Sequence, residues 1–246
     1  LSVMSLLIQE MLYQREVMYG MMKKKKMKTL VLSDLHGYLP HDLPDHELLL
    51  ICGDISPLAI QRNLQNMRYW MANYFFPWVE SLPCKRCYLV WGNHDFIGEK
   101  GEYDAYGKTK VLTDSMDGYK GLKIWGTSWC PVLENWAFYG DSELLKEKFS
   151  LIPENIDILL SHCAPDIDLY GTTIYGDDYG CEELTEAIER SRPRYCFFGH
   201  IHTGDHQPHV YNGITTLANC SVKDENYNPT FNYQIFDIDG TSKQIK

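Results

Sequence analysis

The chain has 246 residues, enough for one substantial core and short for two independent catalytic domains. Hydrophobic residues make up 44% and charged residues 23%, and no fixed-period repeat suggests a solenoid. A formal net charge of -10 argues against stable binding to nucleic acid or to an anionic membrane, because both need a surplus of Lys and Arg.

The N-terminal segment Leu1–Met22 is rich in apolar residues, but glutamine, glutamate and arginine interrupt it, which breaks any membrane-spanning run. The lysines Lys23–Lys26 follow this segment, whereas a secretory signal places its positive charges first. We therefore expect residues 1–26 to be an amphipathic appendage, or a translated leader ahead of a start at Met21, Met22 or Met27. Residues 27–246 would then form one cytoplasmic domain.

Five short apolar runs each end in small or polar residues, which is typical of buried strands that deliver loops. They are Thr29–Leu32, Leu48–Cys52, Tyr88–Trp91, Ile156–Leu160 and Tyr195–Phe198. Helical patterns around Ile60–Tyr74, Ser142–Phe149 and Glu182–Arg190 lie between them, which predicts an α/β layered domain. Late runs at Val210–Tyr211, Thr215–Leu217 and Tyr233–Ile238 lack intervening helices and predict meander strands of a mixed sheet.

The eight cysteines are scattered through apolar runs, which fits a reducing compartment better than a disulfide scaffold. Cys84 and Cys87 form a lone Cys-Lys-Arg-Cys, and no second pair follows at zinc-ribbon spacing. We interpret them as ordinary thiols.

Seven oxygen or nitrogen donors stand directly after the predicted strands, where loops of an α/β sheet converge. They are Asp34, His36, Asp54, Asn93, His162, His200 and His202. Each alone has an ordinary structural explanation, such as a turn residue or a hydrogen-bonded core histidine. Together they favour a cation site, and the glycines at 53, 92 and 199 would allow backbone to approach it closely.

The ordered pattern Asp-x-His, Gly-Asp, Gly-Asn-His-Asp, a lone His and Gly-His-x-His resembles the calcineurin-like metallophosphoesterase superfamily over about Lys28–Asp239. This resemblance implies two mixed β-sheets packed as a sandwich flanked by helices. It also implies two metal ions, the first held by Asp34, His36 and His202, the second by Asn93, His162 and His200. Asp54 would bridge them, and the two ions would activate a shared water.

The resemblance assigns His94 a catalytic role beside the metals, as the group that donates a proton to the leaving oxygen or stabilises it. A bystander role for His94 is the alternative. We expect Asp95 to act only through structural hydrogen bonds, and His206 is the histidine outside the signature that is most suited to line a pocket. Mixed oxygen and nitrogen ligands suit manganese, iron, zinc or nickel, and manganese is our default.

Protein phosphatases of this superfamily extend the second motif to Gly-Asp-x-x-Asp-Arg-Gly, and this chain lacks that acid and that arginine. The chain is more similar to the metallophosphoesterase-domain-containing proteins, relatives of class III cyclic-nucleotide phosphodiesterases. The similar stretches are Ile124–Trp129 with Asn135–Phe138, Leu151–Glu154 leading to Ser161-His162, and Gly199–Thr203 with Asn219–Ser221. The missing acid and arginine leave open which residue, if any, orients His94.

We expect a phosphodiesterase that acts on small or nucleotide-like phosphodiesters, with Trp129 and Trp136 able either to stack on a base or to pack in the core. A phosphomonoesterase or a protein phosphatase of the same fold is one alternative. A non-catalytic scaffold with this fold is another, although such scaffolds usually lose ligands and this chain keeps all seven. The sequence does not indicate an oligomeric state.

Overall fold

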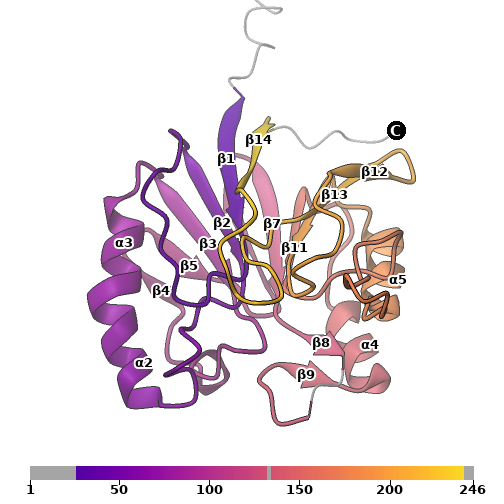
Figure 1. Cartoon of the computed structure of the whole chain (residues 1–246). Helices are drawn as coiled ribbons and strands as arrows, with labels where there is room; N and C mark the ends of the chain where they lie inside the picture. The colour runs from indigo at the N-terminus through magenta and orange to yellow at the C-terminus, as the bar shows by residue number, and fades with distance from the viewer. Residues whose placement is uncertain (1–25, 132–133, 241–246) are drawn as a thin grey trace, which may run out of the picture.

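The computed structural model describes residues 26–131 and 134–240, so all of the predicted leader except Lys26 lies outside it. Two six-stranded mixed sheets face each other, and helices cover the outer face of each (Figure 1). This is the sandwich that the family resemblance implies. In the described part of the chain, no helix is long and apolar enough to cross a membrane.

The first sheet has the order β14-β1-β2-β3-β5-β4. Strands β1, β2, β3 and β5 run parallel, and β14 and β4 are antiparallel edges. The strands are β1 (Met27–Leu32), β2 (Leu48–Cys52), β3 (Arg86–Val90), β4 (Ala105–Tyr106), β5 (Thr109–Val111) and β14 (Gln234–Ile238). On its outer face lie α2 (Leu64–Trp70), a π-helical segment (Met71–Phe75) and α3 (Phe76–Ser81), and a 3-10 turn follows β3 at Gly98–Lys100.

The second sheet has the order β12-β13-β11-β10-β7-β6, with β13, β11, β10 and β7 parallel to one another. Its strands are β6 (Ser115–Tyr119), β7 (Leu122–Thr127), β10 (Ile158–Ser161), β11 (Tyr195–Phe198), β12 (His209–Tyr211) and β13 (Thr215–Asn219). Helices α4 (Ser142–Ser150) and α5 (Glu182–Ser191) cover its outer face. A short parallel pair, β8 (Cys130–Pro131) and β9 (Tyr139–Gly140), lies beside α4.

The core divides according to the alternation of side chains along each strand. In β2, Leu49 and Ile51 pack under the helices of the first sheet, whereas Leu48 and Leu50 face the second sheet. In β10, Leu159 faces α4 and α5, and its neighbours Ile158 and Leu160 face the first sheet. Both faces of each central strand are therefore buried, as expected for parallel strands that read as continuous apolar runs.

One expectation about the late strands is wrong. β12 and β13 pair antiparallel in the second sheet, as a meander would, but β14 crosses to the first sheet and pairs with β1. Phe236 and Ile238 of β14 pack into the core between the sheets, and the pairing covers an edge of β1 that would otherwise be open.

Candidate metal centre

The seven predicted ligands come together at the carboxyl ends of strands from both sheets. In the first sheet, Asp34 and His36 follow β1, Asp54 follows β2 and Asn93 follows β3. In the second sheet, His162 follows β10, and His200 and His202 follow β11. All are buried except the half-buried His200. The loops that follow parallel strands lie at the same edge of a sheet. This arrangement brings donors from five strands together.

Three donors form one group, which we call the Asp34 side: Asp34, His36 and His202. His202 Nε2 lies 3.4 Å from Asp34 Oδ1 and 3.4 Å from His36 Nε2. His202 Nδ1 donates to the carbonyl oxygen of Asp224 at 2.9 Å, which turns Nε2 toward the group. Asp34 Oδ2 accepts from Ser221 Oγ at 2.6 Å, so the carboxylate is held in place from the far side.

A second group, the His162 side, contains Asn93, His162, His200 and a residue that we did not predict, Cys130. His162 Nε2 lies 3.0 Å from Asn93 Oδ1, and His162 Nδ1 donates to the carbonyl oxygen of Cys52 at 2.8 Å. The donor atoms of Cys130, His162 and His200 all lie within 4.8 Å of one another. This side therefore offers nitrogen, amide oxygen and sulfur.

Asp54 lies between the two sides. Its Oδ2 is 3.7 Å from His36 Nε2 and 3.4 Å from His162 Nε2, and its Oδ1 accepts from the backbone N–H of His94 at 2.8 Å. One carboxylate oxygen thus faces both groups, which is the arrangement that a shared ligand requires.

The donors form a buried cluster whose charges balance through protonated histidines. Burial would raise the pKa of Asp34, but the facing His202 holds it well below its usual range. Burial would lower the pKa of His202 and of His162, yet Asp34 beside the first and Asp54 beside the second raise both pKa values to about 9. Two imidazolium groups thus supply the positive charge that cations would supply instead.

The chemistry of this donor set fits two divalent ions. The ion-pair partners of the buried Asp34 and Asp54 are histidines, which become neutral ligands when they lose a proton. His36 Nδ1 is buried without a hydrogen-bond partner. Carboxylate, imidazole and amide donors at this density are typical of transition-metal sites, and the set does not by itself select one metal.

Four of the predicted ligands have left-handed backbone conformations, which non-glycine residues rarely adopt. Their φ values are 56° at Asp34, 41° at His36, 53° at Asp54 and 70° at His200. Each such residue costs on the order of 1 kcal/mol. At these four positions the unusual backbone conformation belongs to the strand-end turns that aim the donors inward.

Glycines next to the donors leave room for carboxylates, as the sequence predicts. A Cβ on Gly92 would collide with the side chain of Asp54, and a Cβ on Gly199 would collide with that of Asp34. Both carboxylates therefore lie directly against backbone of a neighbouring strand end.

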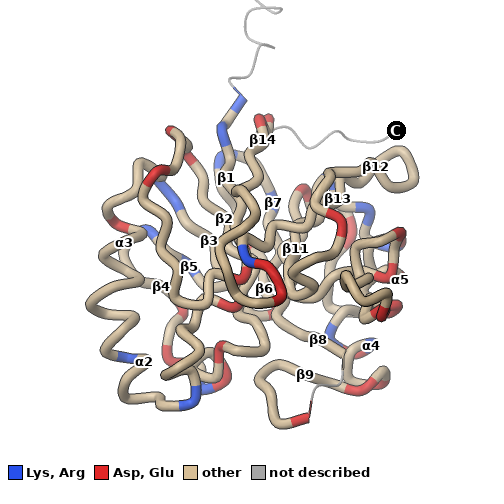
Figure 2. The backbone as a smooth tube through the Cα atoms, viewed as in Figure 1, with Lys and Arg blue, Asp and Glu red and all other residues tan. Residues whose placement is uncertain are grey.

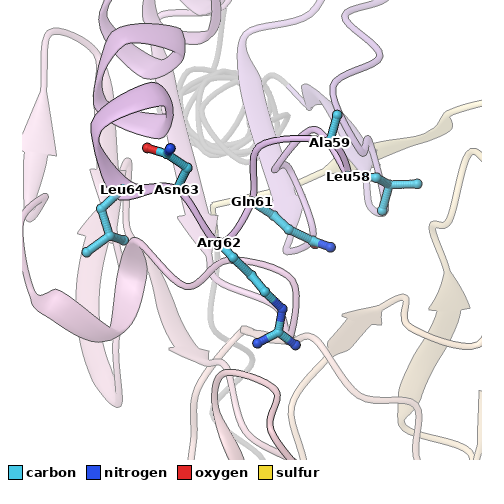
Figure 3. A pocket seen from close by; sticks show the side chains of 6 residues that line it. All are labelled: Leu58, Ala59, Gln61, Arg62, Asn63 and Leu64. Atoms are coloured by element: carbon cyan, nitrogen blue, oxygen red, sulfur yellow. The ribbon is translucent and has the colours of Figure 1, made fainter.

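His94 lies beside the cluster with its two ring nitrogens in different surroundings. Nε2 is 3.8 Å from Asp54 Oδ2, and Nδ1 is 2.6 Å from the side-chain oxygen of Gln61. Gln61 therefore orients His94, a role that the sequence left open. Figure 3 shows Gln61 with Arg62, both lining an open pocket of about 570 Å³ before α2. No sequence signal marks this glutamine, because only the tertiary fold brings it to His94.

Trp136 belongs to the site, and Trp129 belongs to the packing around it. The Trp136 ring centroid is 4.3 Å from that of His94, and the Arg62 guanidinium lies 5.0 Å from the Trp136 ring. Trp129 instead donates from Nε1 to Asp114 at 2.8 Å and packs against the core of the second sheet. Of the two tryptophans considered for base stacking, only Trp136 adjoins His94.

Asp95 has the hydrogen-bonding role that the sequence suggested. It accepts from the backbone N–H of Ser56 at 3.0 Å, from Ser56 Oγ at 2.6 Å and from the backbone N–H of Gly92 at 2.8 Å. Burial, with the nearby charge of Asp54, raises its pKa to about 7. Asp95 thus ties the loop after β2 to the loop after β3.

The connection between β13 and β14, which can be followed in Figure 1, packs against the Asp34 side through Tyr227. In Figure 2 it shows one blue stretch followed by red, which are Lys223 and then Asp224 and Glu225. The Tyr227 ring centroid on this connection lies 4.8 Å from that of His36 and 5.4 Å from that of His202. His206 does not join the cluster, because its Nε2 donates to the carbonyl oxygen of His202 at 2.8 Å and its ring stacks on Phe231.

A second pocket, of about 520 Å³, opens beside His200. Its lining residues come from the β8 strand, the loop before α5, the end of β11 and the β13–β14 connection. They are Pro131, Thr173, Asp178, Tyr179, Gly180, His200, Ile201 and Glu225. One recess therefore includes His200 in its lining, and the other is lined by Gln61, the hydrogen-bond partner of His94.

Comparison with known proteins places this site in a family. Metallophosphoesterase domain-containing protein 1 of Homo sapiens is 29% identical over 231 residues, which is 82% of this chain and 68% of the human protein. UPF0046 protein C25E10.12 of Caenorhabditis elegans is 28% identical over 250 residues, covering 87% of this chain and 82% of that protein. The resemblance to metallophosphoesterase-domain-containing proteins is confirmed.

Solved structures share the fold at low sequence identity. The protein TT1561 of Thermus thermophilus aligns with a TM-score of 0.55 at 15% identity, covering 86% of this chain and 94% of that chain. Phosphopantetheinyl hydrolase from Mycobacterium tuberculosis aligns with a TM-score of 0.51 at 12% identity, covering 83% and 92%. The family model for calcineurin-like phosphoesterase matches residues 27–204. The chain therefore belongs to the calcineurin-like phosphoesterase family and is a metal-dependent phosphoesterase.

Proposed function

We propose that this phosphoesterase acts on small or nucleotide-like phosphodiesters, with Asp34, His36 and His202 binding one ion and Asn93, His162 and His200 the other. Asp54 would bind both. The observation that carries the proposal is that one recess includes His200 and a second is lined by Gln61, which contacts His94. A phosphodiester has two organic groups on one phosphorus, and two separate recesses could each receive one of them.

The charge around the cluster also favours a diester. A phosphate monoester carries up to two negative charges, and arginine is over-represented where proteins make bidentate contacts to phosphate. Here the ion-pair partners of the ligand carboxylates are histidines, and Arg62 stacks on Phe96 and Trp136 beside His94. A diester with a single negative charge needs less compensation.

When bound, two divalent ions lower the pKa of a water and neutralise charge on the phosphoryl oxygens. His94 would give a proton from Nε2 to the leaving oxygen, while Gln61 accepts a hydrogen bond from Nδ1 and fixes the ring. Trp136 and Arg62 would contact the leaving group, because they lie next to the ring that protonates it. Tyr227 would shield the opposite edge of the cluster from water.

The experiment that tests this proposal compares chromogenic diesters with matched monoesters. Ion-free protein is reconstituted with manganese, iron, zinc or nickel, and kcat/KM is measured for bis-p-nitrophenyl phosphate, p-nitrophenyl phosphate and a nucleoside p-nitrophenyl phosphodiester. We expect the diesters to be preferred, and the nucleoside diester most of all. A preference for the monoester under every metal would refute the proposal.

We propose small substrates rather than nucleic-acid polymers, because the net charge of -10 repels a polyanion. A competition assay with single-stranded DNA tests this, because an excess of polymer should leave hydrolysis of the chromogenic diester unchanged. Strong inhibition would show that the site binds polymers.

A further inference from the structure

We propose that Cys130 is a sulfur ligand of the ion on the His162 side, which gives this side a preference for thiophilic metals such as zinc and cobalt. The inference rests on the proposed second ion. Its basis is that the Cys130 sulfur and nitrogen atoms of His162 and His200 all lie within 4.8 Å of one another.

The distances fit one ion. Zinc binds thiolate at about 2.3 Å and imidazole at about 2.0–2.1 Å, so sulfur and nitrogen on one tetrahedral ion lie about 3.5 Å apart. Closing the group around an ion therefore needs movements on the order of 1 Å at most.

Backbone hydrogen bonds fix Cys130 in this place. It forms strand β8 with Pro131 and pairs with Tyr139 of β9, and its N–H donates to the carbonyl oxygen of Phe138 at 2.8 Å. The residue is fully buried. Its sulfur makes a long contact, 3.9 Å to the carbonyl oxygen of Ser128, and it also interacts with the thiol of Cys163. A bond to an ion would therefore replace only weak interactions.

A sulfur ligand would change the charge of the His162 side, because the two sides differ in the charge of their other ligands. The Asp34 side has its own carboxylate, whereas the other ligands of the His162 side, Asn93, His162 and His200, are neutral when they bind metal. Coordination would release the thiol proton to solvent and leave a thiolate, which adds one negative charge to this side. Thiolate donors select zinc and similar metals over manganese and magnesium.

The test uses the full chain loaded with cobalt(II), because thiolate bound to cobalt gives a charge-transfer absorption band that oxygen and nitrogen ligands do not give. Wild-type protein, Cys130→Ser and Cys130→Ala are compared under reducing conditions. Cys84→Ser is the matched control, because Cys84 is also buried but packs with the helices of the first sheet. Bound cobalt is counted by elemental analysis.

We expect the band in wild-type protein and in Cys84→Ser, and its loss in both Cys130 variants. We also expect the ratio of zinc to manganese affinity to fall at least tenfold in Cys130→Ser. Two bound cobalt ions without the band in wild-type protein would overturn the sulfur ligand and leave the proposed function intact. Absence of bound cobalt in wild-type protein would instead overturn both. Since the band is read in the wild type, the test does not depend on the folding of a variant.

Discussion

The two sides of the ligand cluster differ in how their charge is supplied. On the Asp34 side a carboxylate is fixed by Ser221 Oγ and faces His202 at 3.4 Å, so a negative charge is built in. On the His162 side the nearest groups are an amide, two imidazoles and a thiol, and the negative charge comes from Asp54. We infer that the Asp34 side binds hard divalent ions more readily, and that the His162 side depends on Asp54 and on the identity of the metal.

Removing the shared carboxylate should have the largest effect. Asp54→Asn leaves the shape of the side chain but removes the charge that faces both sides, and we expect kcat to fall by about 10³-fold or more. The His162 side should lose its ion first, because its other predicted ligands include no carboxylate. Steady-state kinetics and elemental analysis of the same sample check this.

Asp117→Asn is the control for that variant, because Asp117 lies on β6 and pairs with Arg86 and Lys110, outside the cluster. It should keep both ions and full activity. If Asp54→Asn also kept two ions and near-normal kcat, the two sides would not share a ligand.

Replacing His94 should separate catalysis from metal binding. His94→Ala removes the proton donor, and we expect kcat to fall about 10²-fold for esters with alkyl leaving groups and little for p-nitrophenol, which leaves without a proton. Both ions should remain. His94 also lies in one candidate ligand group with His36 and Asp54, so loss of an ion in this variant would mean that it is a ligand.

The pH should control metal loading. The pKa values of His162 and His202 are raised to about 9, so below that pH both are protonated in the ion-free protein and metal must displace the protons. Affinity for divalent ions should therefore rise up to about tenfold per pH unit for each displaced proton, and level off above about pH 9.

Titration calorimetry at pH 8 in two buffers with different ionisation enthalpies measures these protons directly. His209→Ala is a suitable control, because His209 is exposed and contacts Asp205 away from the cluster. Binding without proton release would contradict the charge balance described for both sides.

The sequence predicts the strand ends well and the surroundings of the site poorly. Leu48–Cys52 and Tyr195–Phe198 are strands with the predicted bounds, because buried parallel strands are continuous apolar runs that stop at glycine. The predicted helix Ile60–Tyr74 begins instead at Leu64, after the cap Asn63. A π-helical segment then leads into α3, which contains Pro77 in its first turn.

The residues that the sequence did not indicate are those placed by tertiary packing alone. Strands β9 and β10 and helix α4 separate Cys130 from His162 along the chain, and Cys130 lies on a two-residue strand that has no periodicity to detect. Ser221 and Asp224 act on the Asp34 side from a connection with no regular pattern. Motif spacing predicts the ligands because they follow strand ends, but the groups that hold these side chains come from elsewhere in the chain.

The smallest expected effect concerns Gln61, and it tests whether this residue acts on the proton donor His94 or on the ions of the two sides. Its side-chain oxygen accepts from His94 Nδ1 at 2.6 Å, and one such hydrogen bond is worth about 0.5–1.5 kcal/mol, or roughly 2- to 10-fold in rate. Gln61→Ala should lower kcat by that factor, with KM and both ions unchanged.

Gln61→Glu should restore orientation, and its carboxylate should raise the pKa of His94, which burial lowers in the native protein. A higher pKa keeps His94 protonated to higher pH, so the alkaline limb of the rate profile should move upward for alkyl leaving groups only. A shift that also appeared with p-nitrophenol would mean that Gln61 acts on the ions rather than on the proton donor.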